Sequence, residues 1–293
     1  MTIRLAGFAP AKINLFLHVT GKRADGYHLL DSLVAFVDIG DRLIATDAPD
    51  FSLDITGPYA AMLDAGPENL VLKAARFVAR HAGTKNGAAF VLEKNLPVAS
   101  GIGGGSSDAA TAMLLVRKLW NVSASFDDTV LAAELGADVP VCLKRRPMRM
   151  NGIGETLQFY DGLPQTFIIL ANPGVPLSTK DVFQRFRMTR SSVREEIPVS
   201  FSTAEQLVQF LTTTQNDLAG PAVEAVPAIG DVVTALREIP GCLTARLSGS
   251  GPTCFGLFAT AEAAFSGAAE LSAKQPNWWV QAGQLGTFPD TNP

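Results

Sequence analysis

The sequence has 293 residues, of which 47% are hydrophobic and 18% are charged, and its formal net charge is −4. Such a composition belongs to a folded globular protein, and the length suffices for one large domain or two ordinary ones. Nucleic-acid-binding proteins usually carry a basic excess, which is missing here, so we expect no nucleic-acid partner. The three cysteines form no CxxC pair, which argues against a disulfide framework and favours a reducing compartment.

The sequence predicts neither a targeting segment nor a membrane span. The N-terminal residues MTIRLAGFAPAKINL contain no long apolar segment and no cleavage-site pattern. The longest uncharged stretch, residues 162–179, is interrupted by three prolines and does not fit a membrane span. We therefore expect a cytoplasmic protein with no membrane partner. The composition fits a monomer and a homodimer equally well.

The first elements are predicted to be strands. Residues 11–19 alternate between two sets of side chains, which predicts a half-buried strand. One set is apolar, and the other set consists of Lys12, Asn14, Phe16 and His18. Residues 20–28 are polar and contain glycine, so we expect a loop. The apolar residues of 29–45 are divided by Gly40 and Asp41, which predicts a hairpin or a tight bend.

The elements that follow alternate irregularly. The first of them are a helix at 69–82, a strand at 88–92, a glycine-rich loop at 97–107, a helix at about 107–120 and a helix at 129–135 that Asp127 or Asp128 is suited to cap. Later ones are strands at 166–171, 243–247, 253–258 and 278–282 and helices at 178–187, 204–211, 229–238 and 261–273. This order favours an α+β fold over a doubly wound sheet. A boundary near Gly162 would give two domains, residues 1–162 and 163–293.

Residues 97–110 read PVASGIGGGSSDAA and form the most distinctive segment of the sequence. Glycines let backbone N–H groups approach an anion without a Cβ in the way, and a following helix adds unpaired N–H donors. Ordering so many glycines is costly, so the run requires a functional reason. We predict a phosphate-binding loop made of Pro97, Val98, Ala99, Ser100, Gly101, Ile102, Gly103, Gly104, Gly105, Ser106 and Ser107.

Two other kinds of phosphate-binding loop do not fit this segment. A Walker A loop requires Gly-Lys-Ser/Thr, and the chain offers only Gly21-Lys22 followed by Arg23. A dinucleotide-binding loop requires GxGxxG directly after a strand, whereas the sixth position here is Ser106 and a proline-containing loop intervenes. An oxidoreductase of that type is therefore disfavoured. With three histidines and no paired ligand spacing, no zinc site is expected either.

Three motifs occur in an order that is typical of one enzyme family. They are PAKINL at 10–15, the loop at 97–107 and LSGSGPT at 247–253. In this respect the chain resembles the GHMP kinases. The resemblance implies an α+β fold with an N-terminal ATP-binding domain like ribosomal protein S5 and a C-terminal domain like the α/β-plait. It also implies that ATP, accompanied by Mg²⁺, and a small-molecule substrate bind between the domains.

Further motifs narrow the resemblance to one branch of the family. These are DGYH at 25–28, LGADVP at 135–140, NGIGE at 151–155 and LSTKDVF at 177–183. The chain is similar here to kinases that phosphorylate the 2-hydroxyl of 4-diphosphocytidyl-2-C-methyl-D-erythritol, in the methylerythritol phosphate (non-mevalonate) pathway to isoprenoid precursors. Two departures from the common pattern, Ile102 and Asp108, are expected to carry no chemistry.

The resemblance also implies a role for individual residues. Asp138 would be the general base and Lys12 would stabilise charge beside it. Asn69 and Lys94 would lie at the ATP site. The substrate would be bound by Asn14, Tyr27, His28, Thr179, Phe183, Gly249 and Ser250. Plainer roles stay open on the residues alone, because Asp138 and Asn69 are each also suited to cap a helix. No protein ligand for magnesium is identified.

Two alternatives to this function stay open. The first is another GHMP kinase that acts on homoserine or mevalonate, but those substrates have no base against which Tyr27 and Phe183 would stack. The second is a non-catalytic sensor that keeps the fold and the ATP site. Such a protein would be expected to have lost Lys12 or Asp138, and both are present.

Overall fold

The structure is a computed structural model that describes residues 3–122, 132–188 and 196–288. Its strands form one sheet in the order β3-β4-β2-β10-β7-β9-β8, with β1 and β5 also paired to β2, and β6 paired to β5. Only the β3–β4 pair is parallel among the described strands. The strands are β1 (Arg4–Lys22), β2 (His28–Ala48), β3 (Ser52–Thr56), β4 (Gly87–Glu93), β5 (Met148–Gly152), β6 (Thr156–Phe159), β7 (Phe167–Asn172), β8 (Cys242–Leu247), β9 (Cys254–Phe258) and β10 (Trp279–Gly286).

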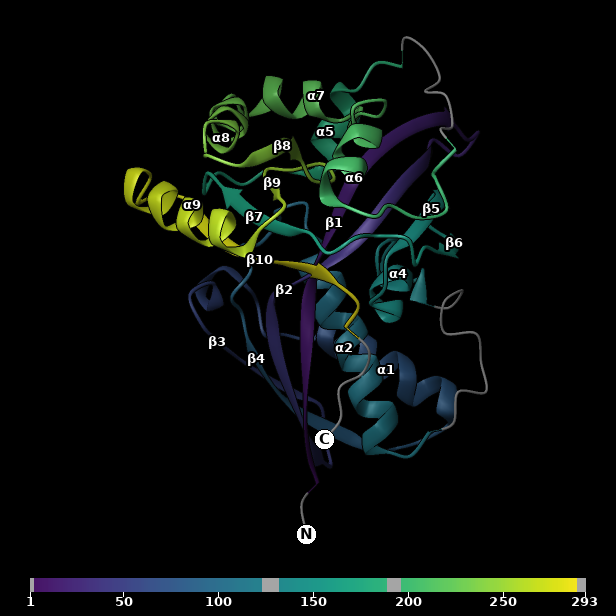
Figure 1. Cartoon of the computed structure of the whole chain (residues 1–293). Coiled ribbons are helices and arrows are strands. Elements are labelled where there is room, and N and C mark those ends of the chain that lie inside the picture. Colours follow the sequence, from purple (N-terminus) through teal and green to yellow (C-terminus); the bar gives the residue numbers. More distant parts are fainter. Residues whose placement is uncertain (1–2, 123–131, 189–195, 289–293) are drawn as a thin grey trace.

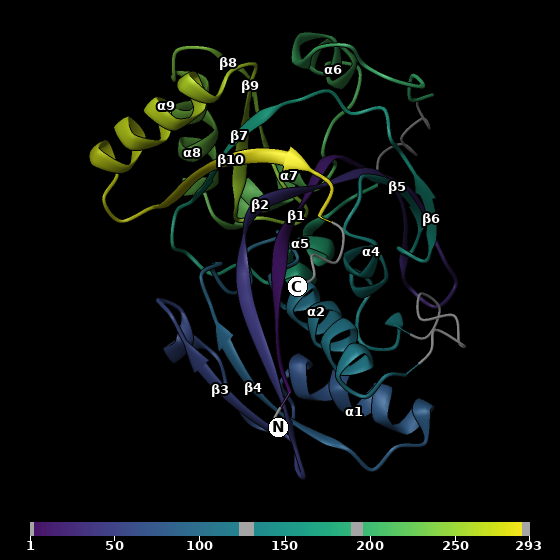
Figure 2. The same ribbon diagram turned by 60° about the horizontal axis from the view of Figure 1, so that its bottom comes forward.

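Helices cover the sheet at both ends of the molecule (Figures 1 and 2). Helices α1 and α2 pack on each other, and α2 also contacts β1 and β2. At the other end, α8 and α9 pack on β7 and β9. The helices are η1 (Ala60–Met62), α1 (Leu70–Ala82), α2 (Gly104–Leu119), α4 (Val139–Lys144), α5 (Thr179–Arg185), α6 (Ala204–Leu211), α7 (Ala219–Ala225), α8 (Ala228–Arg237) and α9 (Ala261–Lys274). This largely antiparallel arrangement confirms the predicted α+β fold.

Strand β1 is buried on both faces over residues 9–19, so the prediction of a half-buried strand is wrong. Its pairing with β2 shifts by one residue between Asn14 and Phe16. Such a bulge turns the side chains that follow it to the opposite face. Lys12, Asn14 and Leu17 therefore line the same cavity, whereas Phe16 packs into a hydrophobic core. The predicted grouping of Phe16 with Lys12 is wrong for this reason.

Strand β2 continues through Gly40 and Asp41, so the predicted hairpin at this point is also wrong. Gly40 lies so close to β1 that a Cβ on it would meet the carbonyl oxygen of Ala9. Asp41 is fully buried, and its Oδ1 accepts hydrogen bonds from the backbone N–H groups of Asn95 and Leu96 at 2.6 and 2.8 Å. Gly-Asp is a dipeptide typical of turns, but here Gly40 allows close contact between two strands and Asp41 is a buried hydrogen-bond acceptor.

Three clusters of buried side chains stabilise the fold. The first lies between the sheet and helices α1 and α2 and includes Phe36 and Phe77. The second lies between β7–β9 and helices α8 and α9. The third contains Ile13 from β1 and Phe255 from β9, so it joins the two halves of the chain. Because this core is shared, β1 is held firmly against the C-terminal half. The predicted domain boundary after Gly162 stays a prediction.

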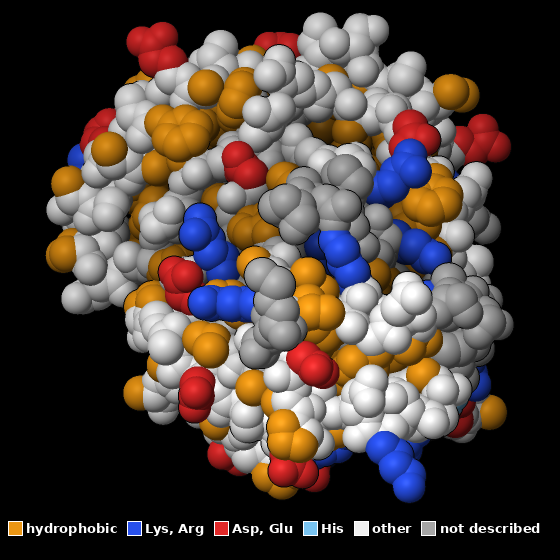
Figure 3. Space-filling view, turned by 90° about the horizontal axis from the view of Figure 1, so that it is seen from below, with side chains coloured by type: hydrophobic (Ala, Val, Ile, Leu, Met, Phe, Trp, Pro, Cys, Tyr) orange, Lys and Arg blue, Asp and Glu red, His pale blue; other side chains and the backbone are white. Residues whose placement is uncertain are grey.

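Most of the predicted helices are confirmed, with ends that differ by one or two residues. The helix expected from about residue 107 begins earlier, at Gly104, because part of the glycine run forms its first turn. The first three residues of the helix expected at 129–135 lie outside the described residues. The sequence pattern did not predict β3, β5, β6 or α7. Within the ranges described, every helix is too short or too polar to cross a membrane. On the face shown in Figure 3, acidic and basic side chains lie side by side.

Candidate active site

Three segments that are distant in the sequence line one cavity of about 650 Å³. They are strand β1, the loop before α2 and the turn between β8 and β9. Helices α1 and α5 and the residues just before α4 add to the wall. Of the predicted site residues, the lining contains Lys12, Asn14, Asn69, Lys94, Pro97, Val98, Ala99, Ser100, Gly101, Gly103, Gly104, Gly105, Ser106, Asp138, Thr179, Phe183, Gly249 and Ser250. The structure therefore brings the three motifs of the sequence to a single place.

The glycine-rich loop is held by the turn between β8 and β9. The backbone N–H of Thr253 donates to the carbonyl oxygen of Ser100 at 3.1 Å. Gly101 has a φ of +74°, and a Cβ on it would lie 2.6 Å from the backbone nitrogen of Gly251. Only glycine allows this approach. The loop then enters α2 through Gly103, which has a φ of +65°. Unpaired N–H groups at the start of α2 suit a phosphate group.

An ion pair lies directly against this loop. Lys12 Nζ is 3.0 Å from Asp138 Oδ2 and donates to Asn14 Oδ1 at 2.8 Å. The side-chain Nδ2 of Asn14 donates in turn to Ser32 Oγ at 2.8 Å, which fixes the orientation of the side-chain amide. A Cβ on Gly103 would be 3.2 Å from Lys12 Cε and 3.9 Å from Asp138 Oδ2. The charged pair is therefore close to any phosphate that binds the loop.

Asp138 is the N-cap residue of α4, but its side chain makes no capping hydrogen bond. The carboxylate is 32% exposed and lines the cavity. Helix capping alone therefore does not explain this residue. A residue before proline usually favours extended geometry, but Val139, which precedes Pro140, is the first residue of α4. Proline is accepted in the first turn of a helix, where its missing N–H has no partner to lose.

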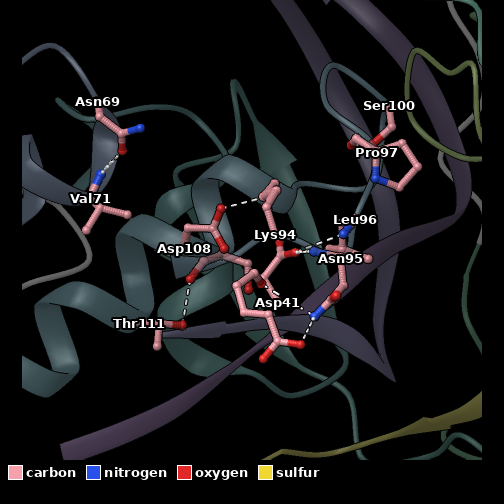
Figure 4. Close-up of polar contacts among 12 residues, drawn as sticks. Asp41, Asn69, Val71, Lys94, Asn95, Leu96, Pro97, Ser100, Asp108 and Thr111 are labelled. Atoms are coloured by element: carbon pink, nitrogen blue, oxygen red, sulfur yellow. Dashed lines mark hydrogen bonds and ion pairs between the residues drawn. The ribbon is translucent and has the colours of Figure 1, made fainter. Parts of the chain in front are cut away.

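A second charged cluster lies buried below the loop (Figure 4). Lys94 Nζ is 2.5 Å from Asp41 Oδ2 and 2.7 Å from Asp108 Oδ2. Burial disfavours the charged ammonium, but the two carboxylates outweigh this effect and raise the pKa of Lys94. Burial also raises the pKa of Asp108, to about 7, against the opposing effect of the Lys94 charge. The sequence analysis expected Asp108 to carry no chemistry, but the structure shows it in a buried cluster of charged groups.

Asn69 caps helix α1, as its position in the sequence allowed. Its Oδ1 accepts from the backbone N–H of Val71 at 3.0 Å (Figure 4). Its Nδ2 donates to the carbonyl oxygen of Asp64 at 2.8 Å. Both ends of the amide are therefore already engaged. Asn69 also lines the cavity, so its predicted role in ATP binding stays a prediction.

The far wall of the cavity carries aromatic and hydroxyl groups. The rings of His28 and Phe183 are stacked, with centroids 5.0 Å apart and an interplanar angle of 23°. Thr179 Oγ1 lies 2.8 Å from Ser250 Oγ. Burial, followed by the nearby charge of Lys22, lowers the pKa of His28, so the ring is neutral at pH 7. A neutral imidazole offers one hydrogen-bond donor and one acceptor.

Four predicted site residues lie outside the cavity lining. Tyr27 is 63% exposed, and His28 contacts the cavity only through Phe183. Ile102 and Ser107 are buried, and the carbonyl oxygen of Ile102 accepts from the backbone N–H of Lys12 at 2.9 Å. The lining also includes residues that were not predicted, namely Leu17, Leu30, Leu63, Asp64, Glu68, Leu70, Leu92, Asp108, Ala137, Met150 and Leu218. Of these, two had a signal in the sequence: Asp108, as the acid directly after the glycine-rich loop, and Ala137, as a member of the LGADVP motif.

Known proteins match the chain along most of its length. Residues 69–146 match the GHMP kinases N terminal domain, and residues 202–277 match the GHMP kinases C terminal domain. A 4-diphosphocytidyl-2-C-methyl-D-erythritol kinase of Cereibacter sphaeroides is 50% identical over 280 residues, which are 95% of this chain and 98% of that protein. The chain belongs to the GHMP kinase family. The family and the fold predicted from its motifs are thereby confirmed.

Two further similarities place this GHMP kinase within the family. A 4-diphosphocytidyl-2-C-methyl-D-erythritol kinase of Dinoroseobacter shibae is 50% identical over 276 residues, which are 94% of this chain and 93% of that one. A crystal structure of 4-(cytidine 5'-diphospho)-2C-methyl-D-erythritol kinase has a TM-score of 0.78 and 33% identity, and the match covers 97% of this chain and 100% of that chain. Since GHMP kinases use ATP, this chain is an ATP-dependent kinase.

Proposed function

We propose that this GHMP kinase transfers the γ-phosphoryl group of ATP to the 2-hydroxyl of 4-diphosphocytidyl-2-C-methyl-D-erythritol. Relatives that match nearly the whole chain bear the name of that kinase. The observation that carries the proposal is the Lys12–Asp138 ion pair, which lies in one cavity between the phosphate loop and the wall of Thr179 and Phe183. A base and a cation at the place where the two substrates meet are suited to phosphoryl transfer.

The loop and the ion pair divide the chemistry between them. Backbone N–H groups of the loop bind the triphosphate, and Mg²⁺ enters with ATP to neutralise part of its charge. Asp138 accepts the proton of the acceptor hydroxyl while that oxygen bonds to the γ-phosphorus and the bond to ADP breaks. Lys12 stabilises the negative charge on the transferring group. A positioned base contributes about 100- to 10,000-fold to the rate of such a step.

The aromatic wall is suited to the cytidine end of the acceptor. Phe183 presents a ring to the cavity, and the neutral His28 beside it offers both a donor and an acceptor to the edge of a base. Tyr27, exposed on the loop before β2, then closes over the base. Each stacked ring contributes about 1–3 kcal/mol to the binding of a base.

Phosphorus NMR tests this proposal directly. The enzyme is incubated with Mg²⁺ and ATP and, separately, with 4-diphosphocytidyl-2-C-methyl-D-erythritol, homoserine or mevalonate. We expect a new phosphomonoester signal only with the cytidine-linked acceptor. We also expect cytidine nucleotides to raise the thermal unfolding temperature, because they bind the folded state alone. A product with homoserine or mevalonate would contradict the substrate. Binding of ATP without transfer to any of the three would point to a non-catalytic sensor.

A further inference from the structure

The buried cluster below the phosphate loop has an excess of negative charge. Lys94 follows strand β4, Asp41 lies on β2 and Asp108 lies in the second turn of α2. Their side chains are 3%, 0% and 4% exposed. One ammonium group therefore faces two carboxylates that are shielded from water. Taking an uncompensated charge out of water is unfavourable unless the charge is paired or a proton neutralises it.

The two carboxylates differ in their hydrogen bonds. Asp41 uses both oxygens: Oδ1 accepts from two backbone N–H groups, and Oδ2 accepts from Lys94. Asp108 Oδ2 also accepts from Lys94, but its Oδ1 has no hydrogen-bond partner among the residues that the structure describes. Asp108 is therefore the member of the cluster with an oxygen available for a proton. The raised pKa of its carboxyl agrees with this difference.

The cluster lies where the phosphates of ATP are expected to bind. Lys94 and Asp108 both line the cavity. A Cβ on Gly104, in the first turn of α2, would lie 3.1 Å from Lys94 Nζ. Phosphates held at the start of α2 therefore lie above the two carboxylates. Their negative charge favours the protonated form of the nearest carboxyl that can accept a proton.

The other ionisable groups around Asp108 leave this conclusion unchanged. On α4 and β1, Lys12 and Asp138 neutralise each other as an ion pair. Cys142 of α4 is fully buried, and burial raises its pKa far above the neutral range. Arg145, at the end of α4, donates to Thr111 and keeps its charge. The buried side chains of α1 are all apolar. Among these described groups, Asp108 is the one whose pKa is raised towards the neutral range.

We infer that binding of the nucleotide to the phosphate loop is coupled to the uptake of one proton from solvent by the Asp108 carboxylate. An O–H bond forms at Oδ1, which cancels the excess negative charge of the cluster, and the ion pair with Lys94 is kept through Oδ2. The proton returns to solvent when the nucleotide leaves. Asp108 is thus a positioning residue that acts through the electrostatics of the loop. The inference rests on the proposed ATP site and concerns no group that reacts.

The coupling has a consequence for affinity. Because the free enzyme must gain a proton in order to bind, its Kd for nucleotide rises once the pH exceeds the pKa of Asp108. Linkage with a pKa of about 7 gives a roughly tenfold weaker Kd at pH 8 than at pH 6. Asp108→Asn keeps an oxygen for Lys94 but cannot titrate, so its Kd should stay within about twofold over this range. The variant should bind more tightly than the wild type at pH 8.

Calorimetry with MgADP tests the inference without turnover. Titrations of the wild type at pH 8, in buffers with different ionisation enthalpies, should show uptake of about 0.5–1 proton per nucleotide. Asp108→Asn should bind MgADP with no such uptake. The matched control is Asp47→Asn, which removes an exposed carboxylate of β2 that lies outside the cavity lining and does not touch Lys94. We expect it to keep both the proton uptake and the pH dependence of the wild type.

The outcomes separate this inference from the proposed function. Binding of MgADP to the wild type without proton uptake would overturn the inference and leave the kinase assignment intact. Proton uptake that persists in Asp108→Asn would overturn it as well. A complete lack of binding would overturn the nucleotide site itself, and the inference with it. The wild-type titration requires no variant, so the test does not depend on how well Asp108→Asn folds.

Discussion

Removal of the Lys94 ammonium group measures how much the buried charged cluster below the glycine-rich loop contributes to the free energy of unfolding. Lys94→Met keeps the length of the side chain but leaves Asp41 and Asp108 without their cation. Asp41 retains the backbone N–H groups that donate to it, whereas Asp108 loses the ammonium at 2.7 Å. Removing one partner of a buried ion pair costs about 3–5 kcal/mol of folding free energy. In a chain of this size that lowers the Tm by about 5–8 °C.

The control for this variant is Lys73→Met. Lys73 Nζ is also 2.7 Å from a carboxylate, that of Glu68, but the two side chains are 41% and 81% exposed. A surface ion pair of this kind contributes less than about 1 kcal/mol. We would measure thermal unfolding of both variants by tryptophan fluorescence at pH 6 and pH 8. The loss for Lys94→Met should be larger at pH 8, because at pH 6 a proton on Asp108 replaces part of the missing charge. Equal losses in the two variants would refute the reasoning.

Three further predictions concern the loop, the cap and the aromatic wall. Gly103→Ala places a Cβ on a residue with a positive φ, 3.2 Å from the Lys12 side chain. It should lower the free energy of unfolding by more than about 1 kcal/mol and also lower kcat. An unchanged kcat in steady-state kinetics would contradict this. Asn69→Ala removes the cap of α1 and should cost about 1 kcal/mol in urea unfolding. If capping is its main role, the KM for ATP will not change. Phe183→Ala should raise the KM for the cytidine-linked acceptor about 5- to 100-fold and leave the KM for ATP unchanged, since stacking contributes about 1–3 kcal/mol; a higher KM for ATP instead would count against the proposed wall.

The sequence predicted the site better than it predicted the arrangement of the strands. The loop at 97–107 was identifiable because a dense glycine run before a helix is costly to order and suits the binding of an anion. The faces of β1 could not be predicted from the sequence. The bulge between Asn14 and Phe16 depends on pairing with β2, and the alternation of side chains does not indicate it. Gly40 and Asp41 resembled a turn, because their true partners lie on β1 and after β4.

The buried charges show a second limit of prediction from sequence. Asp41 and Asp108 lie 53 and 14 residues from Lys94 along the chain, and nothing local marks the three as partners. Lys94 was assigned to the ATP site by resemblance, and the structure shows that its ammonium is engaged by two carboxylates. The stack of His28 on Phe183 was equally unpredictable, because the two rings come from different halves of the chain.

Asp138→Asn tests the central claim most directly. The substitution keeps the shape of the side chain and removes both the base and the charge that faces Lys12. Single-turnover transfer from ATP to the cytidine-linked acceptor should slow by about 100- to 10,000-fold, while the affinity for ATP changes little. The control is Asp161→Asn, which removes an exposed carboxylate paired with Arg146 and should leave the rate unchanged. An Asp138→Asn enzyme that keeps more than about a tenth of the wild-type rate would show that Asp138 is not the base.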